Sequence, residues 1–167
     1  DAVLSDGLTS RLHRRLVREQ RLAASVSSDA SHPGVRAPNL FIIMATPLAS
    51  HTTAEVEAAI YEELERLKRE PVSPKELERV INNLDADMVR ALRSNSGLAS
   101  QLAMYQAVAG DWRDILRSRD RVAAVTPADV QRVAAQYFTK SNRTVGMLVK
   151  KSNGKAIAAT QNNGVAQ

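Results

Sequence analysis

The side chains best suited to metal or proton-transfer chemistry in this sequence are three histidines, His13, His32 and His51. A catalytic zinc site needs several ligands brought together, commonly two histidines one helical turn apart on the same face. No two of these histidines are four residues apart. His13 also lies among three arginines, whose positive charge disfavours a bound cation. The sequence therefore predicts no metal ligand in this chain.

Nucleophilic and phosphate-binding chemistry has no better support. The chain contains no cysteine, so thiolate catalysis and disulfides are excluded. The serines form no Gly-x-Ser-x-Gly elbow, and the seven glycines are isolated, so no phosphate-binding loop is predicted. We therefore expect no catalytic residue here.

The charge balance raises a different possibility. The net charge is +5 and the isoelectric point is about 9.9. Five arginines fall on one short segment near the N-terminus, which allows a basic helical module that binds nucleic acid; they are Arg11, Arg14, Arg15, Arg18 and Arg21. No recognised nucleic-acid motif accompanies them, and most charges alternate in sign along helical patterns. We expect Glu62, Glu63 and Glu65 to form such a solvated surface with neighbouring basic residues, and we expect no nucleic-acid partner.

The elements that must position these side chains follow from periodicity and capping signals. Short apolar runs predict strands over residues 22–30, 39–46 and 143–149. Helical spacing predicts helices over 5–22, from the cap Thr52 to Pro71, from Ser73 to Leu92, from Leu98 to Val108, from Asp111 to Val122, and from Thr126 to Tyr137.

The class predicted is α+β, with a mixed or antiparallel sheet covered by several helices. We expect one domain over residues 1–149 and a flexible C-terminal tail over 150–167, where the composition becomes Lys, Ser, Asn, Gly, Ala and Gln. No apolar run is long enough to cross a bilayer. The opening Asp1-Ala2-Val3-Leu4 has no initiator Met and no signal-peptide pattern, which favours a processed chain or a piece of a longer one.

Four stretches in this order resemble the C-terminal, inactive peptidase-like domain of the pitrilysin/insulinase family of zinc metalloproteases, which includes the mitochondrial processing peptidases. The first stretch, Gly7 to Leu12 followed by Leu16 to Val26, resembles the family's Gly-x-x-Ser-Arg-Leu helix and its Arg-Glu-x-x-Gly-Leu-Ala-Tyr-Ser-Val segment. Pro71 to Arg79, Leu98 to Gly110 and Val122 to Phe138 resemble the helical segments that follow. The resemblance implies a LuxS/MPP-like half-domain. The family domain has further elements before Gly7, so this chain resembles one truncated at its N-terminus.

The resemblance also implies which functional residues are absent. The family's zinc motif, His-x-x-Glu-His, does not occur here, so no cofactor is expected in this chain and zinc is expected in a catalytic domain or partner. The family's second functional feature is an Arg and a Tyr seven residues apart that hold the substrate backbone. Their positions fall on Val17 and Ala24, and Arg21 stands at the motif's Gly. Neither role is carried over to this chain.

The resulting expectation is a non-catalytic domain of a zinc metalloendopeptidase. By resemblance, it forms half of the substrate chamber and supports peptide binding by the zinc-bearing domain, with Ala24, Ser25 and Ser27 facing the chamber. The expected partners are that catalytic domain, in the same chain or in another subunit, and a peptide or unfolded protein substrate. The chain alone is expected to be inactive. If it is bacterial, we expect a periplasmic or secreted location. A scaffold or core subunit of a larger complex remains the other alternative.

Overall fold

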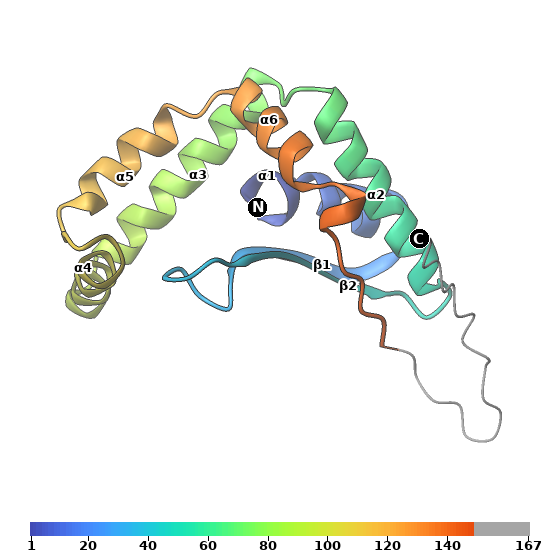
Figure 1. Ribbon diagram of the computed structural model, residues 1–167, viewed down its shortest axis with the longest axis horizontal. Helices are drawn as coiled ribbons and strands as arrows, with labels where there is room; N and C mark the ends of the chain where they lie inside the picture. The colour runs from blue at the N-terminus through green and yellow to red at the C-terminus, as the bar shows by residue number, and fades with distance from the viewer. Residues whose placement is uncertain (149–167) are drawn as a thin grey trace.

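The computed structural model describes residues 1–148, and these form a β-hairpin with helices packed on one side of it (Figure 1). The strands are β1 (Ala23–His32) and β2 (Leu40–Pro47), which pair antiparallel. The helices are α1 (Ala2–Ser5), α2 (Thr53–Arg69), α3 (Pro74–Leu92), α4 (Asn95–Ala109), α5 (Asp114–Ala123) and α6 (Pro127–Tyr137), with a π-helix η1 (His13–Glu19) and a short 3-10 helix η2 (Lys140–Asn142). The predicted α+β class is confirmed.

The first helical segment differs from the sequence prediction of one helix over residues 5–22. Helical structure begins at Arg11 and continues as η1 to Glu19. Two left-handed residues bound the segment: Gly7 with φ 76° before it and Arg21 with φ 52° after it. A helix cannot pass through a positive φ, so the chain turns sharply at both places.

The hairpin contains a β-bulge at its base. Ala23 pairs with Pro47 and Ser25 with Thr46, so β1 has one extra residue, Ala24, at this point. A bulge interrupts the strict alternation of side chains between the two faces. Ala23 and Val26 are therefore both buried against the helices, and Ala24 and Ser25 are both exposed on the opposite face.

Capping residues fix where the helices start, as the sequence predicts. Thr52 and Glu55 form a reciprocal capping box at α2, and Thr126 and Asp129 form one at α6. The Ser73 hydroxyl accepts the Glu76 amide at the start of α3. Helix α4 begins earlier than predicted because the Ser94 side chain caps it, and it ends at Gly110, which has φ 79°.

The core lies between the hairpin and the helices α2, η1 and α6. Leu12, Leu16 and Val72 are almost completely buried. Phe41 and Phe138 pack edge to face, with ring centroids 5.1 Å apart, and join β2 to the end of α6. Helices α3, α4 and α5 extend away from this core as an arm, with α4 at its far end (Figure 1).

The strand predicted over residues 143–149 is wrong for residues 143–148, which have no strand structure. This segment lies along α2 instead: the Arg143 guanidinium stacks on the Tyr61 ring at 3.9 Å, and the Thr53 hydroxyl donates to Met147 Sδ at 3.3 Å. A strand needs a neighbouring edge to complete its hydrogen bonds, and here the segment contacts helix side chains. The predicted tail, 150–167, lies outside the described residues. In the described part, none of the helices combines the length and apolar character needed to cross a bilayer.

Candidate functional site

The segment Gly7 to Leu12 forms a tight turn, and the side chains of Ser10, Arg11 and Leu12 all have structural roles in it. Gly7 adopts a left-handed conformation, and the Ser10 hydroxyl donates to the Gly7 carbonyl at 2.8 Å, which closes the turn. The Arg11 side chain crosses to α3, and Leu12 is fully buried. The Gly-x-x-Ser-Arg-Leu pattern is therefore explained by folding and not by catalysis.

A buried ion network joins η1, α2 and α3. Arg11 donates to both carboxylate oxygens of Glu76, from Nε to Oε1 at 2.8 Å and from Nη2 to Oε2 at 2.9 Å. The second carboxylate is that of Glu63, whose side chain is 0% exposed. Arg15 Nη1 lies 3.3 Å from Glu63 Oε2, and Arg66 Nη2 lies 3.4 Å from Glu63 Oε1. The buried carboxylate of Glu63 and the partly exposed carboxylate of Glu76 are thus held by three arginines: Arg11 just before η1, Arg15 on η1 and Arg66 on α2.

The network holds its charges through hydrogen bonding. The bidentate hydrogen bonds from Arg11 keep the pKa of Glu76 below its usual value, and the same bonds raise the pKa of Arg11. Both groups are thus fixed in their charged forms. A general acid or base must exchange its proton near the working pH, so neither group suits that task.

The prediction that Glu63 belongs to a solvated surface is wrong. Glu62, whose side chain is 65% exposed, fits that description, and Glu63 does not. The signal was present in the sequence: Glu63 follows Ala59 by four residues and Val56 by seven, so it lies on the apolar stripe of α2. Its partner Arg11 comes from a segment far away in the sequence, so no local pattern pairs the two.

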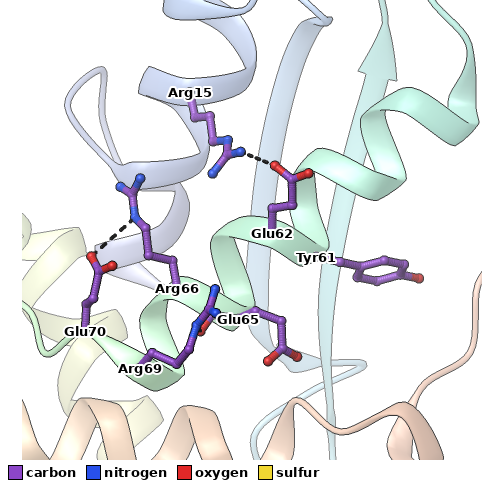
Figure 2. A pocket seen from close by; sticks show the side chains of 7 residues that line it. All are labelled: Arg15, Tyr61, Glu62, Glu65, Arg66, Arg69 and Glu70. Atoms are coloured by element: carbon purple, nitrogen blue, oxygen red, sulfur yellow. Dashed lines mark hydrogen bonds and ion pairs between the residues drawn. The ribbon is translucent and has the colours of Figure 1, made fainter.

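A surface pocket lies beside this network, over α2 and η1 (Figure 2). It has a volume of about 450 Å³. Figure 2 shows Arg15 reaching Glu62 and Arg66 reaching Glu70, while Tyr61 points away from these charges. Its lining side chains are Arg15, Tyr61, Glu62, Glu65, Arg66, Arg69 and Glu70. Opposite charges neutralise one another within it, so it presents neither an anion site nor a cation site.

The three histidines stay apart in the fold. His13 lies on η1, His32 ends β1, and His51 precedes α2, where its Nδ1 is 3.6 Å from Glu55 Oε2. Within residues 1–148, no three His, Cys, Asp or Glu side chains come together in a way that could hold a metal ion. The described residues do not fit the zinc site of a metallopeptidase.

The two positions expected to match the family's Arg/Tyr pair, Val17 and Ala24, lie in different environments. Val17 packs against the hydrophobic core from η1. Ala24 lies on the exposed face of the hairpin, in the bulge. Arg21 has a φ of 52°, a backbone conformation that glycine adopts without strain. This agrees with the alignment, in which Arg21 occupies the position of the motif's glycine. That agreement supports the register that places Val17 and Ala24 at the two functional positions.

The expected chamber-facing residues do lie together on one surface. Ala24, Ser25 and Ser27 are all exposed on the side of β1 that points away from the helices. The bulge is responsible, because it turns Ala24 to the same side as Ser25. The result is a row of three small side chains along β1, without a charged or bulky group among them.

The basic N-terminal segment is not a free cationic surface. Arg11 and Arg15 bind the carboxylates of the buried network, and Arg14 Nε lies 3.4 Å from Glu19 Oε1. Three of the five arginines in this segment are therefore ion-paired. Two of the five, Arg11 and Arg15, hold this segment against α2 and α3.

Comparison with known proteins agrees with this arrangement. Residues 1–84 match the model of the family described as the peptidase M16 inactive domain. The chain is 28% identical over 146 residues to the zinc protease PqqE of Helicobacter pylori, covering 87% of this chain and 32% of that protein. The chain thus spans about a third of the length of this curated relative.

Solved structures share the fold over most of the chain. The inactive peptidase domain of a candidate zinc protease from Bordetella parapertussis superimposes with a TM-score of 0.78 at 27% identity, covering 92% of this chain and 82% of that one. A protease from Helicobacter pylori superimposes with a TM-score of 0.76 at 26% identity, covering 84% of this chain and 33% of that one.

Proposed function

The chain belongs to the M16 peptidase family, as a domain of the inactive type, and from this premise we propose that it forms one wall of the chamber in which a zinc-bearing domain hydrolyses peptides. The observation that carries the proposal is the open row of small side chains on β1, Ala24, Ser25 and Ser27. Small, uncharged side chains leave room for an extended peptide.

In this proposal the chemistry belongs to the partner domain. A zinc ion bound in that domain would supply an activated water molecule, which is the general role of zinc in metallopeptidases. This chain confines the substrate and supports its position. Since neither Val17 nor Ala24 can donate a hydrogen bond from its side chain, the grip on the substrate backbone must come from elsewhere in the assembly.

Two assays test the proposal. The chain alone, incubated with zinc and an unstructured peptide, is expected to show no hydrolysis. When it is produced together with the His-x-x-Glu-His domain encoded in the same reading frame or beside it, hydrolysis is expected to appear. Hydrolysis by this chain alone that a chelator abolishes would show that it is a peptidase in its own right.

A matched pair of variants tests the chamber face. Ala24→Trp fills space in front of the exposed face of β1, whereas Ala135→Trp adds the same bulk at an exposed position on α6. We expect Ala24→Trp to raise the KM for an extended peptide by about tenfold, a cost of roughly 1.4 kcal/mol, and Ala135→Trp to change it little. Equal KM values for the two variants would remove β1 from the chamber wall.

A further inference from the structure

A second surface pocket lies between the loop that joins β1 to β2 and the last turn of α4. Figure 1 shows this hairpin loop extending toward the end of the arm, where α4 lies. The pocket has a volume of about 320 Å³, and it is lined by Pro33, Gly34, Val35, Arg36, Ala37 and Val108. The guanidinium of Arg36 is the one polar side-chain group in this lining. The pocket therefore combines apolar walls with a single positive charge.

The charge of Arg36 is not neutralised by a neighbouring side chain. In the part of the chain that the structure describes, most arginines form ion pairs and Arg36 forms none. The carboxylates nearest in sequence have other partners: Asp29 Oδ1 accepts hydrogen bonds from the amide and the hydroxyl of Ser31, and Asp111 Oδ1 lies 3.4 Å from Arg113 Nη1. An unpaired guanidinium beside an apolar pocket is suited to bind a carboxylate from outside the chain.

The loop also offers backbone hydrogen-bond donors. Within the described chain, none of the N–H groups of residues 34–37 donates to a backbone carbonyl. Pro33 and Pro38 fix φ near the two ends of the loop, and the Asn39 side-chain amide donates to the Gly34 carbonyl at 3.5 Å. These restraints reduce the entropy that a ligand must remove from the loop. Free N–H groups next to an arginine are the donors with which proteins bind a terminal carboxylate.

We propose that this loop pocket binds the C-terminal residue of a peptide, with the carboxylate on Arg36 and an apolar side chain against Val35 and Val108. Its volume of about 320 Å³ is at the lower limit of small-ligand sites, so it admits one or two residues and not an extended segment. The inference deepens the proposed function and rests on it for the presence of peptides. The substrate class that it names is peptides with an apolar C-terminal residue.

Titration of the isotope-labelled chain, followed by NMR, tests the proposal. The probe is acetyl-Ser-Gly-Ser-Leu with a free carboxylate, and its control is the same peptide with a C-terminal carboxamide. We expect the amide signals of Gly34, Val35 and Val108 to shift with a Kd on the order of 0.1–1 mM, because one ion pair and one apolar contact are gained. The carboxamide is expected to bind at least about fivefold more weakly. Equal binding of the two peptides, or no shift at about ten times this Kd, would overturn the proposal.

Two variants with matched controls test the pocket itself. Arg36→Gln removes the charge of the pocket, whereas Arg18→Gln removes the charge of another exposed arginine, on η1. Val108→Glu places a carboxylate in the pocket, whereas Val133→Glu places one on α6 at a position with the same 42% exposure. We expect the two pocket variants to weaken binding of the carboxylate peptide by about fivefold or more, and the controls to leave it unchanged. Unweakened binding by Arg36→Gln would contradict the assignment of the carboxylate to this arginine.

The position of the shifted signals separates this inference from the proposed function. Shifts confined to Ala24, Ser25 and Ser27 would overturn the loop pocket and leave the chamber face standing. Shifts at the loop, together with no effect of Ala24→Trp on KM, would keep the loop pocket and remove β1 from the chamber wall. Octanoate gives the last comparison: if it shifted the same signals with the same Kd as the peptide, the pocket would bind any apolar carboxylate, and the assignment to peptides would be overturned.

Discussion

Substitution of Glu63 tests the buried ion network most directly. In Glu63→Gln the side chain keeps its shape and loses its charge, while three guanidinium groups lie within 4 Å of that carboxylate, at 3.9, 3.3 and 3.4 Å. Removing one partner from a buried ion pair costs about 3–5 kcal/mol. Each of the three arginines keeps a second carboxylate partner, so we expect the lower end, a loss of about 3 kcal/mol in the free energy of unfolding.

The neighbouring residue provides the matched control. Glu62 also binds Arg15, but its side chain is 65% exposed, compared with 0% for Glu63. Exposed ion pairs contribute about 0–1 kcal/mol, so Glu62→Gln is expected to cost less than 1 kcal/mol. The two variants differ in burial and hardly in chemistry.

The assay is urea unfolding followed by circular dichroism, with thermal unfolding as a second measure. A loss of 3 kcal/mol corresponds to a fall in Tm of about 6–12 °C for a chain of this size. If Glu63→Gln lost no more stability than Glu62→Gln, the carboxylate of Glu63 would have to be solvated, and the burial argument would be refuted.

Two further predictions concern packing and pH. Gly97→Ala places a Cβ 2.0 Å from the backbone oxygen of Ala91 and is expected to lower the free energy of unfolding by at least about 1 kcal/mol, whereas Gly34→Ala, with open space around it, should change little; urea midpoints decide between them. The pKa of Glu76 is lowered in the fold, so its ion pair stabilises the protein above the ordinary glutamate pKa and this contribution is lost as pH falls through the lowered value. Glu76→Gln should therefore make the free energy of unfolding fall less steeply below about pH 4.5. If the variant lost stability at low pH as steeply as the unmodified chain, the lowered pKa of Glu76 would not be the cause of that loss.

Local sequence signals were sufficient for most helix boundaries. The capping residues Thr52, Ser73 and Thr126 start α2, α3 and α6 as predicted, and Gly110 ends α4. These signals work because a cap satisfies backbone groups within the same few residues. The strands β1 and β2 were also predicted, with boundaries displaced by one or two residues.

Predictions failed where the outcome depended on a distant partner. Residues 143–148 have the composition of a strand, but no neighbouring strand pairs with them, and they lie on α2. The helix predicted over residues 5–22 is broken at Gly7 and ends before Arg21, whose left-handed conformation no propensity for arginine would indicate.

The sequence by itself established that this chain contains no cysteine and no His-x-x-Glu-His motif, because folding cannot supply residues that the sequence does not contain. It also indicated the family, since the order of its short motifs reflects turns and caps that are local. Only the tertiary structure decided that the motif arginine Arg11 meets Glu76, that Glu63 is buried, and that a bulge exposes Ala24 beside Ser25. Each of these depends on contacts between segments that lie far apart in sequence or on the register between two strands, and those are fixed when the whole core packs.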